Sequence, residues 1–156
     1  MLHGSMEFRI LGSLEILEGA TTLSLGPEKQ RAVLAVLLLN ANQAVSIEKL
    51  VDELWGDDPP EKAVKAIQTY VSRLRKVLPE GTLRTRPPGY AIELEPGQLD
   101  LHRFERGLED GHRALTGGNP ARASASLREA LALWRGSALS EFSSEPFART
   151  EGSRLE

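Results

Sequence analysis

Residues 62–94 read KAVKAIQTYVSRLRKVLPEGTLRTRPPGYAIEL, and their pattern is the most informative in the chain. Apolar residues recur at three- and four-residue spacing through the first part, which predicts an amphipathic helix that stops before Pro79. Residues 58–61 have the form of a capping box that would begin this helix. The predicted apolar stripe comprises Val64, Ile67, Val71, Leu74 and Leu78. The second part holds two β-prone runs, 82–86 and 90–94, which Pro87-Pro88-Gly89 would join into a hairpin.

The residues before this stretch predict a small sheet and two more helices. Apolar and polar residues alternate in 7–10, 14–16 and 21–25, which favours an antiparallel sheet of about three strands. A helix from Pro27 to about Leu39 is apolar almost all round, so it should be enclosed by other elements. Ser46 should cap a second, amphipathic helix that Gly56 ends. Strands, three helices and a hairpin, in this order, predict a winged helix-turn-helix of the α+β class.

The residues after the hairpin differ in composition, since 99–156 contain eight arginines and no lysine. Residues 96–99 read as a linker. Two helices are expected at 102–115 and 120–134, and a third is expected to begin at 146–155. A helical hairpin of about 34 residues is the unit of tetratricopeptide-like arrays, so we predict an all-α, tetratricopeptide-like module that is incomplete here. The residues expected to face one another across the pair are Phe104, Leu108, Leu115, Leu127, Ala130, Leu131 and Trp134.

The charge of the chain is unevenly distributed. The formal net charge is −3, yet residues 62–90 hold seven cations against the single anion Glu80. Residues 1–61 hold 4 cations and 10 anions. This division indicates one face that meets an anionic partner while the rest of the surface stays acidic.

A basic helix followed by a basic hairpin predicts binding to double-stranded DNA, because a major groove admits one helix and reads its hydrogen-bonding side chains. The side chains expected to reach base edges are Gln68, Thr69, Ser72 and Arg73. Those expected to contact phosphates are Lys65, Tyr70, Arg75 and Lys76. Arg84 and Arg86 in the wing suit an adjacent minor groove, where the negative potential favours arginine.

Other classes of protein find little support. The chain has no cysteine and three histidines, so no metal site is predicted, and a cytoplasmic location is expected. It contains none of the motifs G-x-x-x-x-G-K-[ST], G-x-G-x-x-G after a strand, H-E-x-x-H or G-x-S-x-G, so no catalytic residue or cofactor is predicted. The longest apolar run, 32–39, is too short to span a membrane. Residues 1–5 read as a cloning remnant. One alternative is a small hydrolase that uses Asp57, Asp58 or His112. A stronger alternative is a signalling module whose basic winged helix docks on an acidic protein.

Several stretches together resemble one known family. They are Phe8-Arg9-Ile10-Leu11-Gly12, Gln30-Arg31-Ala32-Val33-Leu34-Ala35, Leu54-Trp55-Gly56-Asp57-Asp58-Pro59-Pro60, Gln68-Thr69-Tyr70-Val71-Ser72-Arg73-Leu74-Arg75, Pro88-Gly89-Tyr90, Arg103-Phe104-Glu105, Ala130-Leu131-Ala132-Leu133-Trp134-Arg135-Gly136 and Leu139. From Glu7 onward the chain resembles the Streptomyces antibiotic regulatory proteins (SARPs) of actinobacteria.

The resemblance implies an OmpR-type winged-helix DNA-binding domain over 6–95, a linker at 96–99 and, over 100–156, the start of a truncated bacterial transcriptional activation domain. It implies activators that bind direct repeats near promoters as tandem or dimeric pairs, contact RNA polymerase and its sigma factor, and switch on antibiotic biosynthesis genes. In that pattern Thr69, Ser72 and Arg73 stand at base-reading positions. Arg75 stands at a phosphate contact, and Arg86 stands where the wing enters the minor groove.

Overall fold

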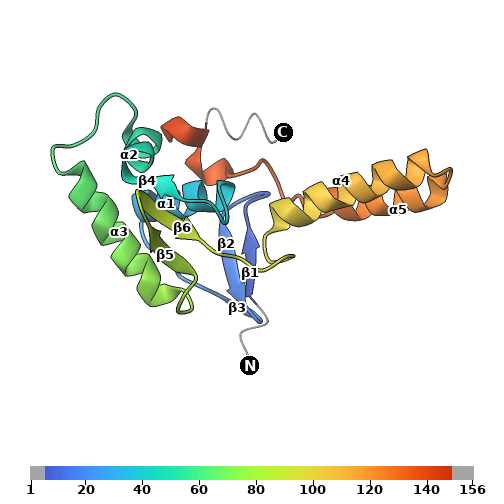
Figure 1. The fold of residues 1–156 in the computed structure, drawn as a ribbon, viewed down its shortest axis with the longest axis horizontal. Helices are drawn as coiled ribbons and strands as arrows, with labels where there is room; N and C mark the ends of the chain where they lie inside the picture. The colour runs from blue at the N-terminus through green and yellow to red at the C-terminus, as the bar shows by residue number, and fades with distance from the viewer. Residues whose placement is uncertain (1–5, 149–156) are drawn as a thin grey trace.

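The computed structural model describes residues 6–148, so the expected cloning remnant at 1–5 lies outside the described residues. The chain opens with the predicted antiparallel sheet, ordered β1 (Met6–Arg9), β2 (Glu15–Glu18) and β3 (Thr21–Thr22) (Figure 1). Phe8 is opposite Ile16 in the register, and both side chains are buried. The alternation in the sequence therefore identified the correct inner face of this sheet.

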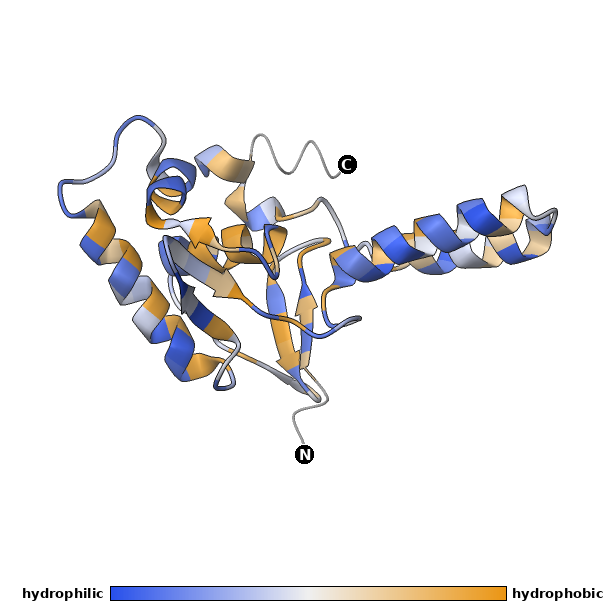
Figure 2. Ribbon diagram, in the orientation of Figure 1, coloured by the Kyte–Doolittle hydropathy of each residue, from blue (hydrophilic) through white to orange (hydrophobic). Residues whose placement is uncertain are grey.

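Two helices follow as predicted. Helix α1 (Glu28–Leu39) is buried without interruption over 32–38, because the sheets and the other helices surround it. Figure 2 shows the apolar residues of the chain concentrated where these elements meet. Helix α2 (Ile47–Trp55) begins at Ser46, whose hydroxyl accepts a 3.0 Å hydrogen bond from the Lys49 amide. It ends at Gly56, which has a φ of 61°, a conformation that glycine adopts without steric cost.

The third helix, α3 (Ala63–Val77), corrects two predictions at its N-terminal end. The capping box at 58–61 does not form: Lys62 is the N-cap residue, and its side chain makes no capping hydrogen bond. Instead the Ala63 amide donates to the Pro60 carbonyl in a turn at 3.1 Å. Ala63 lies in the buried stripe with Ile67, whereas Val64, predicted to lie there, is 50% exposed. The predicted end before Pro79 is confirmed.

The predicted hairpin forms one side of a second sheet. Its strands are β5 (Leu83–Arg86) and β6 (Gly89–Ile92), and a short strand before α2, β4 (Val45–Ser46), completes the order β4-β6-β5. At Gly89 a Cβ atom would lie 1.9 Å from the Val45 carbonyl oxygen. Only glycine permits this close approach of β4 to β6.

Two antiparallel helices, α4 (Asp100–Thr116) and α5 (Pro120–Leu131), extend away from the rest of the molecule (Figure 1). The predicted contact between Phe104 and Trp134 is present, with ring centroids 5.5 Å apart in an edge-to-face arrangement. α5 ends three residues earlier than expected. The other predicted contacts are partly wrong, because the helices meet through Gly107 and Gly111, which pack against Ala130 and Leu127. Four of the expected contact residues remain exposed, namely Leu108, Leu115, Leu131 and, although it packs against Gly111, Leu127.

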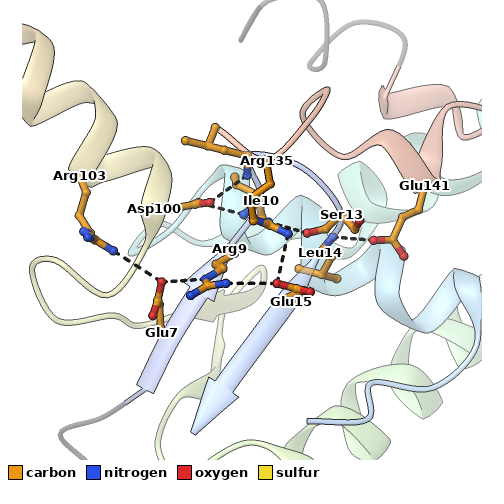
Figure 3. Close-up of polar contacts among 11 residues, drawn as sticks. Glu7, Arg9, Ile10, Ser13, Leu14, Glu15, Asp100, Arg103, Arg135 and Glu141 are labelled. Atoms are coloured by element: carbon orange, nitrogen blue, oxygen red, sulfur yellow. Dashed lines mark hydrogen bonds and ion pairs between the residues drawn. The ribbon is translucent and has the colours of Figure 1, made fainter. Parts of the chain in front are cut away.

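A buried carboxylate anchors the helical pair to the first sheet (Figure 3). Asp100, at the first turn of α4, is 2% exposed and accepts hydrogen bonds from the amides of Ile10 at 2.9 Å and Leu11 at 3.0 Å. Burial raises the pKa of Asp100 above its ordinary value, although these amides oppose the shift. On the surface above, Glu7 pairs with Arg9 and Arg103.

The last described residues return to the body of the molecule. The Arg135 amide donates to Leu11, and the Leu139 amide donates to Gly12. After the short helix η1 (Ser140–Phe142), the rings of Phe142 and Phe147 are buried 5.7 Å apart in the same core as the winged helix. The helix expected at 146–155 is described only to Ala148, where 146–148 are helical, and its remaining residues lie outside the described part of the chain.

Candidate nucleic-acid interface

Helix α3 lies along the outside of the molecule, with one face against α1 and α2 and the opposite face open to solvent (Figure 1). Six of the eight predicted recognition-helix residues lie together around a shallow hollow on the open face. They are Lys65, Gln68, Thr69, Ser72, Arg73 and Lys76. Their spacing of three, one, three, one and three residues follows one side of a helix. The helix contains no carboxylate, so this surface has only cations and neutral hydrogen-bonding groups.

Within this open face, the Thr69 hydroxyl already has a partner. Its Oγ1 donates to the Lys65 carbonyl at 3.1 Å, the bond to the preceding turn that threonine often forms in a helix. The hydroxyl proton is therefore directed along the helix, while the oxygen lone pairs and the methyl group remain available. Thr69 suits an acceptor or apolar contact better than a donor contact. Gln68, Ser72 and Arg73 are exposed and can supply donors.

The other two predicted helix residues turn toward the body of the protein. Tyr70 is half-buried and packs against the hydrophobic core. Arg75 donates from Nε to the Leu83 carbonyl at 3.1 Å and from Nη2 to the Thr85 hydroxyl at 2.6 Å. Its guanidinium carbon also lies 5.6 Å from the centre of the Tyr90 ring. Arg75 thus joins α3 to the wing, a role that spacing along one helix does not reveal.

The wing carries its two predicted arginines, and it also carries an acidic residue that the prediction missed. Glu93 pairs with Arg84 Nε at 2.9 Å and lies 3.8 Å from Arg86 Nη1. Arg84 also donates to the Gly81 carbonyl, and Arg86 to the Asn42 carbonyl. The register observed in the structure explains this pairing: β5 and β6 pair Arg84 with Ala91, so Glu93, two residues further on, shares its face. The three-residue tip expected at 87–89 is wrong, because Gly89 belongs to β6, and that tip would have placed Glu93 on the opposite face.

The residues that a hydrolase would use do not lie in one site. Asp57 and Asp58 are exposed in the loop between α2 and α3, and His112 is exposed on α4. Over residues 6–148, no three histidine, aspartate or glutamate side chains gather in a way that could hold a metal ion. The same residues contain no helix that is both long and apolar enough to cross a membrane.

Comparison with known proteins adds to this geometry. Residues 21–92 match the family described as transcriptional regulatory protein, C terminal, and residues 99–156 match the bacterial transcriptional activator domain. Regulatory protein AfsR of Streptomyces coelicolor is 39% identical over 153 residues, which are 97% of this chain and 15% of AfsR. Regulatory protein DnrI of Streptomyces peucetius is 35% identical over 162 residues, 97% of this chain and 60% of DnrI. The chain belongs to the SARP family.

A solved structure agrees with this assignment to the SARPs. EmbR of Mycobacterium tuberculosis, in complex with a low-affinity phosphopeptide, superposes with a TM-score of 0.92 at 34% identity. The match covers 97% of this chain and 41% of the EmbR chain. The fold class predicted from the sequence, an OmpR-type winged helix followed by a helical module, is confirmed. This SARP chain spans less than two thirds of the length of each of these three relatives.

Proposed function

We propose that this SARP-family chain is a sequence-specific DNA-binding activator that places α3 in a major groove and the wing in the adjacent minor groove. The observation that supports it most is the open face of α3, where six hydrogen-bonding or cationic side chains gather without a carboxylate. A surface of this kind meets the phosphate charge and leaves donors for base edges. A surface that docks on an acidic protein would usually carry charges of both signs, whereas this face carries no carboxylate.

The proposal assigns different tasks to the residues of this face. Gln68, Ser72 and Arg73 contact base edges, and Thr69 contributes an acceptor or methyl contact. Lys65 and Lys76, at the two ends of the hollow, contact phosphates. Arg84 and Arg86 reach the minor groove from the wing. Tyr70 and Arg75 hold the helix and the wing in place, and the N–H groups of Arg75 that are not bonded to Leu83 or Thr85 can still meet a phosphate.

The resemblance to the SARP family supports a further proposal about where the protein acts and which partners it has. The protein acts in the cytoplasm and binds direct repeats near promoters as a tandem pair or homodimer. It recruits RNA polymerase through its sigma factor and activates genes for antibiotic biosynthesis. The similar proteins AfsR and DnrI are both regulatory proteins of Streptomyces, which supports a regulatory role.

The test is selection from a pool of random duplex DNA at two salt concentrations about fourfold apart. We expect enrichment of a short direct repeat, with affinity falling steeply as salt rises. Strong salt dependence without enrichment would overturn the claim of sequence specificity. An absence of binding at both salt concentrations would overturn DNA as the partner and favour docking on an acidic protein.

A further inference from the structure

One acidic side chain lies against both arginines of the wing. Glu93 Oε1 is 2.9 Å from Arg84 Nε, and Oε2 is 3.8 Å from Arg86 Nη1. The backbone fixes this position, because the Glu93 amide donates to the Thr82 carbonyl at 2.8 Å and continues the ladder of the hairpin. Glu93 is thus held on the wing by main-chain geometry.

In the strand register, no side chain directly opposite the two arginines can pair with them in place of Glu93. Arg84 is paired with Ala91 and Arg86 with Gly89, so the residues directly opposite the arginines have no side chain that could reach them. Residues two apart on a strand point to the same side, which places Glu93 diagonally across from Arg84. The wing face therefore combines two cations with one anion.

This ion pair contributes little to folding. The side chains of Arg84, Arg86 and Glu93 are 60%, 46% and 40% exposed, and ion pairs at such positions have small effects on stability because solvent screens them. Its main electrostatic effect acts on whatever approaches the wing. A phosphate at the arginines must displace the Glu93 carboxylate or lie close to it, and like charges repel.

From this geometry we infer that Glu93 is a specificity-determining residue that weakens the contact of the wing with DNA phosphates of any sequence. The inference rests on the proposed DNA-binding function. Discrimination between sites often depends on a repulsive element that only the correct contacts overcome. Base contacts by α3 seat the wing deeply enough to separate the arginines from Glu93, whereas a random site lacks these contacts.

The test compares the wild-type protein with Glu93→Gln and Glu95→Gln on short duplexes of random sequence. Both substitutions remove one negative charge and keep the shape of the side chain. Glu95 lies two residues further along, is exposed, and forms no ion pair with any residue between 6 and 148. For Glu93→Gln we expect binding about three- to tenfold tighter near physiological salt, the effect of roughly one additional phosphate contact. The slope of log affinity against log salt should steepen by about 0.9.

A second measurement separates this role from a structural one. The melting temperature of Glu93→Gln should equal that of the wild type, and its preference for the selected direct repeat over random DNA should fall. Weaker binding by Glu93→Gln would show that Glu93 positions the arginines and would overturn the inference, as would an equal gain by Glu95→Gln. Equal binding by all three proteins would overturn this inference alone, while an absence of DNA binding by all three would overturn the proposed function with it.

Discussion

A single buried carboxylate joins residues that are far apart in the sequence. Asp100 accepts the amides of both Ile10 and Leu11 at a point where β1 has ended and no strand partner is available. Buried amides without acceptors are costly, so this side chain takes the place of a missing strand. Beside it, the Phe8 amide donates to the Gln98 carbonyl at 2.7 Å, so main-chain and side-chain contacts together connect the start of α4 to the first sheet.

We predict that Asp100→Asn lowers the free energy of unfolding by about 1–3 kcal/mol, because the amide group offers one acceptor oxygen where two buried amides need partners. Urea unfolding followed by circular dichroism measures this loss. The matched control is Asp110→Asn, an exposed position on the same helix, which should change stability by less than about 0.5 kcal/mol. Equal losses from the two variants would contradict the role of Asp100.

Glu7 provides a prediction about pH. The hydrogen bond from Arg9 lowers the pKa of Glu7 below its ordinary value, so its contribution to stability is present above the unfolded-state pKa and is lost as the pH falls through the folded-state pKa. The wild type should therefore be more stable than Glu7→Gln at neutral pH, and the difference should vanish in strong acid. Thermal melts across the acid range test this. A difference that grows on acidification would contradict it.

For Asp100 the pH dependence has the opposite sign. Burial raises its folded-state pKa, so the stability linked to its protonation is fully present below the unfolded-state pKa and is lost as the pH rises through the folded-state pKa. The hydrogen bonds that its oxygens accept from Ile10 and Leu11 are a separate contribution.

The open face of α3 predicts two kinds of loss on DNA. Arg73→Ala should cost about 1–3 kcal/mol on the selected repeat and relax the preference at one base position, because it removes the base contact proposed for Arg73. Lys76→Ala should weaken binding to all sequences alike and reduce the salt slope by about one. Titrations on the selected repeat and on random DNA separate the two effects. Equal losses on both DNAs for both variants would refute the division.

The recognition helix and the wing behave as one unit because of contacts between elements. Arg75 ties α3 to β5, and β4 pairs with β6 beside Gly89. The hairpin is thus fixed on both sides, by a guanidinium on one and by a strand on the other. The relative positions of α3 and the wing, the two elements proposed to contact DNA, are therefore set by contacts within the protein.

We predict that Gly89→Ala separates β4 from β6. A Cβ at this position would meet the Val45 carbonyl at 1.9 Å, and a contact that short requires the backbone to move. We expect a loss of about 1–3 kcal/mol of unfolding free energy and weaker DNA binding through a displaced wing. Gly97→Ala is a useful comparison for added bulk, since nothing lies within 4 Å of its Cβ position, although its positive φ adds local strain. An unchanged melting temperature for Gly89→Ala would contradict the prediction.

Local patterns predicted most of the elements, and contacts between elements explain where they failed. The enclosed helix α1, the Ser46 cap and the hairpin each depend on neighbouring residues, and each was found. The capping box predicted at 58–61 does not form, because a turn at Pro60 precedes α3 and Lys62 is its N-cap residue. Val64 faces solvent instead of the core. The leucines of the helical pair were misplaced because Gly107 and Gly111 allow closer packing than leucine stripes imply.

The predicted interface shows the same limit. Six of the eight helix residues lie on one face, as a helical repeat requires. The inward turn of Arg75 depends on the wing carbonyl at Leu83, a partner that only the folded chain brings near. Glu93 lies beyond the basic stretch 62–90, and only the pairing of β5 with β6 brings it to the wing arginines.

The two ends of 6–148 share one core, from which the helical pair projects. Phe142 and Phe147, near the end of the described chain, are buried with residues of α1 and of the first sheet. Lys29 of α1 donates to Glu145 at 2.9 Å, and Arg31 pairs with Glu141. The segment after α5 therefore closes over the winged helix, so that the helical pair is held at both of its ends.

This arrangement predicts one cooperative unfolding transition. The chain has two tryptophans, Trp55 in α2 and Trp134 after α5, so Trp55→Phe and Trp134→Phe leave one fluorescent reporter in each half. The two denaturation curves should coincide. Phe142→Ala creates a cavity at a fully buried site, so it should lower the free energy of unfolding by about 3–5 kcal/mol. Both midpoints should shift to lower denaturant concentration. Leu115→Ala, at an exposed position of the helical pair, should shift neither. Two separate midpoints would show independent halves.

The projection of the helical pair has a mechanical consequence. Helix α4 has 17 residues, so at the usual rise per residue the turn at 117–119 lies about 25 Å from Asp100. A rotation of about 5° at that pivot would move the turn by about 2 Å. A force applied at this turn, for example by a bound partner, would act with a long moment arm on the hydrogen bonds from Ile10 and Leu11 to Asp100. Those bonds attach the pair to the first sheet, which shares its core with α3.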